Sequence, residues 1–436
     1  MSTITNLYST KTISHSLSRT TMEIRKIPGG VTAAKGFSAA SCMAGIKYQN
    51  RTDMAMIFSD APCAAAGTFT SNVVKAAPVL WDREIVKSAQ PVQAVVINSG
   101  IANAGTGAEG MAICEKTAEA AGKKLNIPTR AVLIGSTGVI GMQIPLERIE
   151  AGVALLAESL GHGAEKGTEA SRAIMTTDTV NKETAVVIEL PDAEGTGTVP
   201  VTIGGMSKGS GMIHPNMCTM LAYITTDCAV DKALLQKLVS GIVADTFNMI
   251  SVDGDTSTND TLLVLANGMA GNRPITEEDE SCRLFAEALE GVCRELAMKM
   301  AADGEGATHL IESTVTGMDT KENARVLARS VVSSSLVKAM VFGRDANCGR
   351  ILCALGYAGP VFDPDKTEIR MSGECGEVVF CRGGAVLSFD EELALRILSE
   401  DKVRFVSDMH MGEESAMAWG CDLTYDYVKI NGDYRT

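Results

Sequence analysis

Aromatic residues and histidine are scarce in this sequence. Phe, Trp and Tyr together make up 4% of the 436 residues, and His occurs five times. So few aromatic rings offer little surface on which nucleic-acid bases could stack. The formal net charge of −14 disfavours long-range attraction to nucleic acid or to anionic membranes. The composition therefore argues against nucleic acid or a membrane surface as the partner.

Long apolar runs and paired cysteines are missing as well. No apolar run approaches the ~18–20 residues that a membrane-spanning helix requires. The 12 Cys contain no CxxC pair, which argues against a zinc-binding module. Scattered thiols in a chain without a secretory signal predict a reducing, cytoplasmic location, where they act as small buried apolar groups.

The N-terminal segment 1–21 lacks acidic residues and lacks the continuous apolar stretch of a signal peptide. It is rich in Ser and Thr, and its cations are Lys11 and Arg19. We expect this segment to be a disordered extension or a mis-assigned start, with Met22 as the alternative start. A transit peptide fits less well because arginine is so sparse.

Apolar and small residues, by contrast, are abundant: 45% of the chain is hydrophobic, with 42 Gly and 22 Met, which suits a large and tightly packed core. Short apolar runs predict strands at 92–98, 131–135, 184–190, 199–203, 220–226 and 261–266. Amphipathic stretches predict helices at 112–125, 146–159, 231–246, 277–302, 321–340 and 391–399. Alternating patterns at 368–388 and 413–430 predict antiparallel β structure. The fold class is α/β or α+β, in two or three closely connected domains.

Charge is distributed unevenly along the chain. Residues 1–218 contain 19 Lys and Arg against 18 Asp and Glu, whereas residues 219–436 contain 20 against 35. The acidic residues of the second half are spread along amphipathic stretches instead of forming one run. We interpret them as a solvated acidic face.

A glycine-rich loop at 206–227, MSKGSGMIHPNMCTMLAYITTD, leads abruptly into an apolar strand. Glycine allows sharp bends and a close approach of the backbone to a ligand. The loop is not a P-loop, because its Lys precedes the glycines and GxxxxGK[ST] does not occur. From spacing alone, Thr219 reads as an ordinary strand residue. The functional alternative is a nucleophile created by self-cleavage before Thr219, whose new α-amine would act as base for its own hydroxyl.

Several ordered motifs resemble the self-cleaving ornithine acetyltransferases of arginine biosynthesis. They are KGSGMIHPNMCTMLAYITTD at 208–227, GGVTAAKGFSAA at 29–40, NSGIANAGTG at 98–107, GSTGVIG at 135–141, IMTTDT at 174–179, NMISVDGDTSTND at 248–260, GRDANCGR at 343–350 and CDLTYDYVKINGDYRT at 421–436. The resemblance covers nearly the whole chain beyond Met22. It implies a layered α-β-β-α sandwich of the ornithine acetyltransferase/aminopeptidase kind with an additional α/β C-terminal domain. It also implies cleavage into an alpha chain, 22–218, and a beta chain, 219–436, that stay together as an α2β2 heterotetramer.

The resemblance also implies site residues, motif by motif. Thr219 is the expected nucleophile, and Thr137 and Gly138 of GSTG are the expected oxyanion-hole pair. The expected substrate contacts are Thr176 or Thr177, Lys208, Thr219, Glu305, Asn431 and Thr436. Their chemistry suits an N-acetylated amino acid, because Lys208 can pair with a carboxylate and Glu305 with an ammonium, while Asn431 offers both amide polarities. Which of the two threonines makes the contact stays open.

Cys218 departs from the family pattern, in which Ala commonly precedes the cleavage threonine. Both residues are small, so we expect cleavage between Cys218 and Thr219 to persist. Cys218 also raises an alternative, a nucleophilic Cys218–His214 pair. That alternative is the weaker one, because a cysteine at the new carboxyl terminus would be free to move away after cleavage.

Metal binding has little support in the sequence. Asp253, Asp255, Asn259 and Asp260 lie close together but fail the EF-hand pattern, and a turn capped by its own carboxylates is the simpler interpretation. His214 and His309 lack ligand partners at regular spacing and are expected to be loop or packing residues. We expect no metal and no organic cofactor, and acetyl-CoA as a co-substrate stays open.

The expected reaction is ping-pong transfer of acetyl from N2-acetyl-L-ornithine to L-glutamate through acetyl-Thr219. Two alternatives remain. An N-terminal-nucleophile amidohydrolase or aminopeptidase would release the acyl group to water, and a non-catalytic homologue would stay uncleaved. The sequence does not indicate whether arginine inhibits the enzyme.

Overall fold

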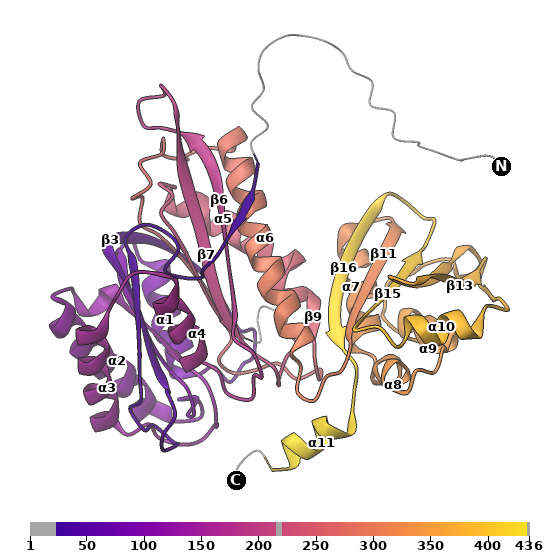
Figure 1. Ribbon diagram of the computed structural model, residues 1–436, viewed down its shortest axis with the longest axis horizontal. Helices are drawn as coiled ribbons and strands as arrows, with labels where there is room; N and C mark the ends of the chain where they lie inside the picture. Colours follow the sequence, from indigo (N-terminus) through magenta and orange to yellow (C-terminus); the bar gives the residue numbers. More distant parts are fainter. Residues whose placement is uncertain (1–22, 215–219, 434–436) are drawn as a thin grey trace.

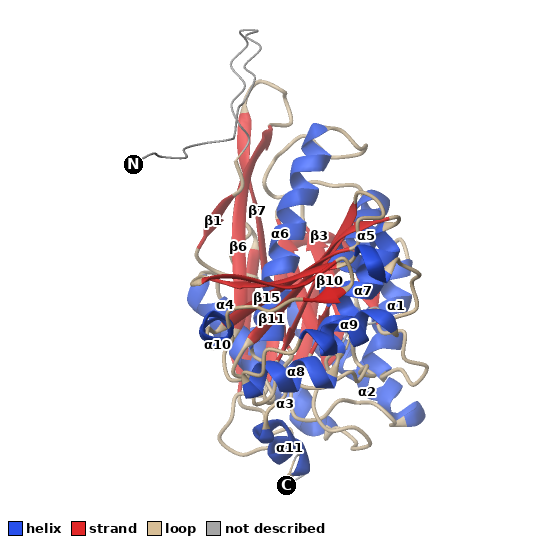
Figure 2. Ribbon diagram, turned by 90° about the vertical axis from the view of Figure 1, so that its right-hand side faces the viewer, coloured by secondary structure: helices blue, strands red, loops and turns tan. Residues whose placement is uncertain are grey.

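The computed structural model describes residues 23–214 and 220–433. The expectations for segment 1–21, Cys218, Thr219 and Thr436 lie outside the described residues. Two β-sheets with flanking helices organise the described chain, the first at the left of Figure 1 and the second at its right. Figure 2 shows the same helices and strands from the side.

The first sheet has nine strands in the order β1-β6-β7-β8-β10-β3-β4-β5, with β2 paired to β3. Its strands are β1 (Arg25–Ile27), β2 (Phe37–Cys42), β3 (Met54–Phe69), β4 (Val92–Asn98), β5 (Val132–Ser136), β6 (Lys182–Pro191), β7 (Thr198–Lys208), β8 (Leu221–Thr226) and β10 (Thr261–Ala266). The long strand β3 is shared by two parts of the sheet, because its first part pairs with β2 and β4 and its last part pairs with β10. The sheet therefore divides at β3 into two parts.

The two parts face each other across a shared core. A Cβ atom at Gly135 in β5 would lie 2.0 Å from the hydroxyl of Tyr223 in β8, so glycine allows the parts to approach. Along β8, Leu221 and Tyr223 join this inner core, whereas Ala222 and Ile224 join the core on the opposite face. This alternation is expected for a strand buried on both faces.

Helices cover the two outer faces. Helices α2 (Gly107–Leu125) and α3 (Leu146–Ser159) pack on the β2–β5 part, whereas α5 (Lys232–Asp245) and α6 (Glu280–Ala302) pack on the other part. Helix α1 (Ala77–Lys87) covers the open edge of β5, where Trp81 donates to the Val132 carbonyl at 3.0 Å. Helix α4 (Ala164–Ala173) contacts β2 and β3. The layers confirm the predicted α-β-β-α sandwich.

The second sheet has seven strands in the order β14-β13-β12-β15-β11-β16-β9. Its strands are β9 (Ile250–Ser251), β11 (Leu310–Met318), β12 (Glu368–Gly373), β13 (Gly376–Arg382), β14 (Ala385–Val386), β15 (Lys402–Asp408) and β16 (Glu414–Cys421). Its helices are α7 (Lys321–Ser333), α8 (Ser335–Gly343), α9 (Cys348–Gly356) and α10 (Glu391–Ile397). This C-terminal module is the predicted additional α/β domain, and α6 contacts both sheets.

The predicted strands in the sandwich are all present, with ends that shift by a few residues. Two predictions in the C-terminal module are wrong. The helix predicted at 321–340 is broken at Ser334, whose side chain accepts a hydrogen bond from Val337 N and so starts α8. The β structure predicted at 413–430 ends at Cys421 and is followed by helix α11 (Tyr425–Gly432), which has no buried face. The antiparallel β structure predicted at 368–388 is confirmed.

Within residues 23–214 and 220–433, no single helix is long and apolar enough to span a membrane. Helices α7 and α8 reach the length and apolar composition of a membrane span only when they are taken together as a bent pair. Helix α7 packs on β11 and β16.

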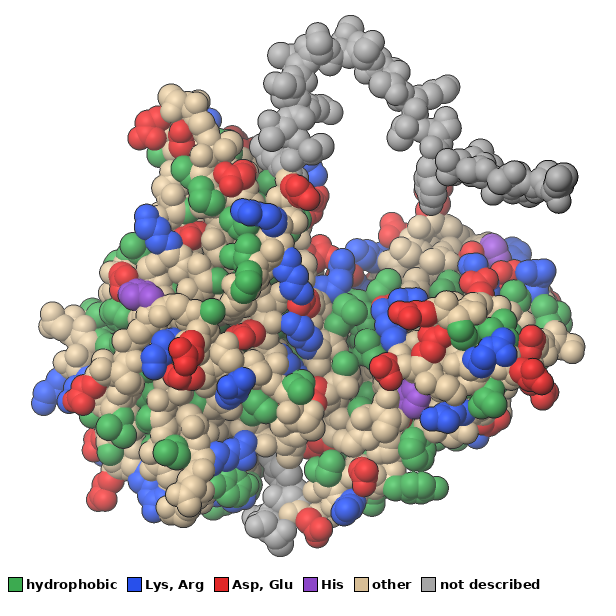
Figure 3. Space-filling model, in the orientation of Figure 1, with side chains coloured by type: hydrophobic (Ala, Val, Ile, Leu, Met, Phe, Trp, Pro, Cys, Tyr) green, Lys and Arg blue, Asp and Glu red, His purple; other side chains and the backbone are tan. Residues whose placement is uncertain are grey.

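Acidic and basic side chains are interspersed on the face drawn in Figure 3, over the C-terminal module as well as the sandwich. On α6, Arg283 pairs with Glu287 and Arg294 with Glu290, each four residues apart. Some acidic residues of α6 are thus paired with an arginine four positions away, an arrangement common on exposed helix surfaces.

Candidate active site

One cavity of about 290 Å³ brings the predicted site residues together. Those that line it and lie within the described residues are Thr137, Gly138, Thr176, Thr177, Lys208, Glu305 and Asn431. Met220, the residue directly after Thr219, also lines it, and Met212 and Ile213 do so from the preceding side of the loop. The sequence therefore identified a set of residues that converges from distant segments on a single cavity.

The turn of Thr137 and Gly138 directly follows β5. Gly138 has φ +128°, and a Cβ atom there would lie 2.3 Å from the carbonyl carbon of Gly100, so only glycine fits. Thr137 N donates to the Asn98 carbonyl at 3.0 Å, and Val139 N donates to the Gly100 carbonyl at 3.1 Å. The turn is thus fixed against the loop that follows β4.

Asn259 holds the same two loops from a third segment. Its amide nitrogen donates to the carbonyls of Ala102, at 2.5 Å, and Ser136, at 2.8 Å, and the residue lines the cavity. It lies in the NMISVDGDTSTND motif, but from sequence we expected it only to form part of a turn. Its function as a tie between loops depends on contacts with residues more than 120 positions away, which no local pattern reveals.

Thr176 and Thr177 both line the cavity, so the structure does not separate them. The Thr177 hydroxyl lies 3.1 Å from that of Ser210 in the glycine-rich loop. Arg51 donates from Nη2 to the carbonyls of Met175, at 2.7 Å, and Thr176, at 3.0 Å. Arg51 belongs to none of the recognised motifs, and the sequence offered no signal for it.

Lys208 is the last residue of β7 and is 8% exposed. Its Nζ donates to the Thr137 hydroxyl at 3.3 Å and lies 3.9 Å from a carboxylate oxygen of Asp178. Burial lowers the pKa of Lys208, and the negative charge of Asp178 opposes that shift. The ammonium therefore lies beside the predicted oxyanion turn, where it can attract a substrate carboxylate.

Glu305 provides a negative charge on the same cavity. It is 5% exposed and accepts a hydrogen bond from Asn431 Nδ2 at 2.7 Å. A Cβ atom at Gly211 would lie 2.3 Å from the Glu305 carboxylate, which explains a glycine at this point of the KGSG loop. A ligand that carries both a carboxylate and an ammonium would find a partner for each charge.

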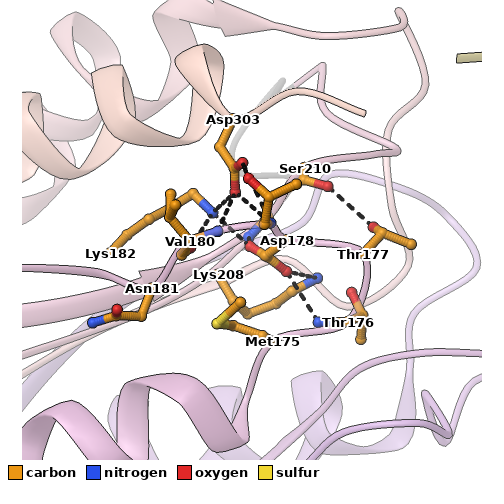
Figure 4. Close-up of polar contacts among 12 residues, drawn as sticks. Met175, Thr176, Thr177, Asp178, Val180, Asn181, Lys182, Lys208, Ser210 and Asp303 are labelled. Carbon is orange, nitrogen blue, oxygen red and sulfur yellow. Dashed lines mark hydrogen bonds and ion pairs between the residues drawn. The ribbon is translucent and has the colours of Figure 1, made fainter. Parts of the chain in front are cut away.

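A buried charge network lies behind Lys208 (Figure 4). The Lys182 ammonium lies 2.7 Å from a carboxylate oxygen of Asp178 and 2.6 Å from one of Asp303, and the side chain of Lys182 is 0% exposed. Asp178 and Asp303 occur in the IMTTDT motif and beside Glu305, but neither was assigned a role from sequence. Burial alone would raise the pKa of Asp178, yet the charges of Lys208 and Lys182 hold it well below its usual range.

His214 and His309, which the sequence also singled out, do not line the cavity. His214 Nδ1 lies 3.0 Å from the Ser251 hydroxyl, and burial, with Arg329 and Lys338, lowers the His214 pKa to about 4. This position gives no support to the Cys218–His214 alternative, although Cys218 itself lies outside the described residues. His309 is a packing residue, as predicted, and its Nδ1 lies 3.1 Å from Asp422.

Asp253 also behaves as predicted, because its carboxylate caps a turn. It accepts hydrogen bonds from the backbone amides of Met212, Ile213 and Asp255. In the part of the chain that the structure describes, no three His, Cys, Asp or Glu side chains form a group that could hold a metal.

Known proteins resemble this chain along most of its length. The ArgJ family model matches residues 38–436. The chain is 50% identical, over 412 residues, to the arginine biosynthesis bifunctional protein ArgJ of Symbiobacterium thermophilum, and the match covers 94% of this chain and 99% of that protein.

Two solved structures are also similar. The arginine biosynthesis bifunctional protein ArgJ of Bacillus halodurans is 42% identical with a TM-score of 0.46, and the match covers 48% of this chain and 97% of that one. The ornithine acetyltransferase of Mycobacterium tuberculosis, solved with ornithine, is 40% identical with a TM-score of 0.40. That match covers 46% of this chain and 100% of the other.

Proposed function

The chain belongs to the ArgJ family, and we propose that this acyltransferase of arginine biosynthesis moves an acetyl group from N2-acetyl-L-ornithine to L-glutamate. The observation that carries this proposal is the single cavity on which a hydroxyl-bearing turn, a buried ammonium and a buried carboxylate converge. Those groups match the three features of the donor: an acetyl carbonyl, a carboxylate and a side-chain ammonium.

The first step in the proposal is self-cleavage. The Thr219 hydroxyl attacks the carbonyl carbon of Cys218, the C–N bond between them breaks, and an ester forms while the α-amine of Thr219 is released. Water then hydrolyses the ester, which leaves a carboxylate on Cys218 and a free hydroxyl on Thr219. The new amine, with a reference pKa of about 7.7–8.0, is partly unprotonated at neutral pH and serves as the base.

In the transfer step, the Thr219 hydroxyl attacks the acetyl carbonyl and its proton passes to the α-amine. Thr137 and Gly138 stabilise the negative charge that develops on the carbonyl oxygen. The proton is returned to the departing nitrogen, ornithine leaves, and acetyl-Thr219 remains. The α-amine of glutamate then attacks this ester in the reverse sequence and releases N-acetylglutamate. Lys208 binds the carboxylate that both substrates share.

The two cleavage products would remain associated. Strand β7 lies before the cleavage point and β8 after it, and the two pair along their length from Ile203 to Lys208. The buried Lys182–Asp303 pair joins the same two pieces. We propose an α2β2 heterotetramer in the cytoplasm that works without a metal or organic cofactor.

Intact mass measurement tests the nucleophile. The Thr219→Ala chain should remain a precursor of 45.9 kDa and transfer no acetyl group, whereas the wild-type chain should separate into two pieces under denaturing conditions. Efficient processing of Thr219→Ala contradicts the assignment of Thr219. A wild-type chain that stays uncleaved and inactive would indicate a non-catalytic homologue.

An assay of both products distinguishes transfer from hydrolysis. Wild-type enzyme given N-acetylornithine and glutamate should form one N-acetylglutamate for each ornithine. Release of acetate in place of N-acetylglutamate would favour the amidohydrolase alternative. The same assay with acetyl-CoA in place of N-acetylornithine determines whether acetyl-CoA is a second donor.

A further inference from the structure

The carboxylate of Asp178 lies where three segments of the cavity wall meet. One oxygen accepts hydrogen bonds from Gly209 N and Lys182 Nζ, both at 2.7 Å. The other accepts from Thr176 N at 3.0 Å and lies 3.9 Å from Lys208 Nζ. The side chain is 0% exposed and does not line the cavity, so Asp178 would act on a ligand only through its neighbours.

Three of those neighbours line the cavity directly: Thr176, Lys208 and Gly209. Gly209 also begins the loop that continues to Gly211 beside Glu305. The Asp178 carboxylate therefore contacts the backbone at Thr176, the backbone at Gly209 where the glycine-rich loop starts, and the Lys208 ammonium (Figure 4). Charge-assisted hydrogen bonds of this kind are stronger than neutral ones.

The charges that face Lys208 are unequal in effect. Asp178 and Glu305 favour its cationic form, whereas Lys182 and Arg51 oppose it. Burial is the largest influence and also disfavours the cation, and Asp178 is the largest influence that opposes burial. Removal of the Asp178 charge would therefore make the ammonium easier to deprotonate.

Asp303 belongs to the same buried network but has a different set of contacts. Its carboxylate accepts from Lys182 Nζ at 2.6 Å, from Thr179 N at 3.0 Å and from the Thr179 hydroxyl. Among the described residues, Asp303 makes no hydrogen bond or ion pair with Lys208, Thr176 or Gly209. Asp303 thus neutralises Lys182 from the far side, which leaves the second oxygen of Asp178 for Lys208.

We propose that Asp178 is a positioning residue for the acyl-transfer reaction. It keeps Lys208 charged and directed at the substrate carboxylate, and it fixes Thr176 and Gly209 around that ammonium without touching substrate. Asp303 supports the same network but does not position the cavity wall. This inference rests on the proposed function, because it takes Lys208 to be the group that binds the carboxylate.

The test compares Asp178→Asn with Asp303→Asn. Calorimetry measures the Kd of L-ornithine as a function of pH, and steady-state kinetics give kcat and KM for N-acetylornithine. In Asp178→Asn, binding at pH 8 should weaken by about tenfold or more, the expected scale for loss of a charge-assisted contact. The alkaline limb of the binding profile, which reports deprotonation of Lys208, should move to lower pH by roughly one unit. An opposite charge as close as the Asp178 carboxylate is to Lys208 typically shifts a pKa by about 1–3 units.

Asp303→Asn is the matched control. It also removes one carboxylate from buried Lys182 and should lower the urea midpoint, but its alkaline limb should stay at the wild-type position. The amines of ornithine titrate identically in every experiment, so differences between variants report the protein. KM should rise in Asp178→Asn more than kcat falls, as expected for a change in binding.

Equal shifts of the alkaline limb in the two variants, or no shift in Asp178→Asn, would overturn the proposal.

If Asp178→Asn does not accumulate as folded protein, Asp178→Glu is the test. It keeps the charge, so the limb should stay in place while KM rises because the carboxylate is displaced from Thr176 N and Gly209 N. An unchanged KM in that variant also overturns the proposal. Absence of acetyl transfer in the wild-type enzyme, by contrast, contradicts the proposed function and leaves the binding comparison intact.

Discussion

In the nine-stranded sheet, β7 and β8 reach the cavity and the turn after β5 borders it, whereas none of the described lining residues lies on a strand of the seven-stranded sheet. The C-terminal module and its connections contribute Glu305, on the loop after α6, and Asn431, on the final helix α11. The sandwich thus supplies the residues proposed for the chemistry, and the outer module supplies a partner for the substrate's side chain. The C-terminal module therefore reaches the cavity through two peripheral segments and not through the strands of its sheet.

The largest expected effect comes from the buried network that ties the sandwich to the start of the Glu305 loop. Lys182→Met leaves Asp178 and Asp303 without the cation between them. Loss of one partner from a buried ion pair typically costs about 3–5 kcal/mol, so the free energy of unfolding in urea should fall by that amount. Lys237→Met, in an exposed pair with Glu278, is the matched control and should leave the midpoint nearly unchanged. Equal effects would show that the buried network does not join the two regions.

The next largest effect is expected at the turn of Thr137 and Gly138, which lies in the sandwich. In Gly138→Ala, the new Cβ overlaps the carbonyl carbon of Gly100, so the turn must move. We expect kcat to fall by about 10²–10³, equivalent to ~2.7–4 kcal/mol, the effect of losing one oxyanion donor. Gly141→Ala is the control, because Gly141 also has a positive φ but no atom lies within 4 Å of its Cβ position. A similar loss of kcat in both variants would indicate backbone strain instead of a lost donor.

The contribution of the C-terminal module should be smaller and should appear in binding. Asn431→Ala removes the hydrogen bond to the Glu305 carboxylate, a contact of a kind worth roughly 1.5–3 kcal/mol. KM for N-acetylornithine should rise by about tenfold or more, with kcat changed far less. Neighbouring Lys429→Ala on the same helix, which does not line the cavity, should leave both constants near wild type. A dominant loss of kcat in Asn431→Ala would place the outer module in the chemistry itself.

The smallest effect concerns the ion pairs that join the two regions at the surface. Asp245, at the end of α5, pairs with Arg325 and Lys321 of α7. Burial alone would raise the pKa of Asp245, but these cations lower it overall. Its contribution to stability is therefore present above the unfolded pKa of about 3.9 and is lost as pH falls through the folded value. We expect less than about 1 kcal/mol from Asp245→Asn at pH 7, and a difference from wild type that shrinks as the pH falls below the unfolded pKa. A difference that does not shrink as the pH falls would contradict the electrostatic origin.

Six of the nine sandwich strands could be predicted because they are mostly apolar runs, whereas β1, β2 and the long β3, which include polar or small residues, were not predicted. Thr261–Ala266 is buried along its whole length and was delimited from sequence to the residue. The segment after Cys421 was misread because the end of β16 depends on a distant contact. There, Asp422 accepts hydrogen bonds from the amides of Thr308 and His309. Such contacts join positions more than 110 residues apart, and local periodicity carries no information about them.

The candidate site shows the same division. Thr137, Lys208 and Glu305 were expected at the site because their motifs resemble those of a known family, and not because their local pattern alone indicated a site. Arg51 and Asn259 were missed as site residues, since their importance lies in the carbonyls that they reach and not in their own neighbours in sequence.

The sequence by itself determined the family, the alternation of strands and helices, and the residue types available for the chemistry. These depend on local composition and spacing, which a linear pattern records directly. Only the tertiary structure decided that seven predicted residues from five separate places in the chain share one cavity. It also decided that the carboxylates of Asp178 and Asp303 contact different partners. The reason is physical: burial and charge pairing depend on distances through space, and those distances exist only after the chain has folded.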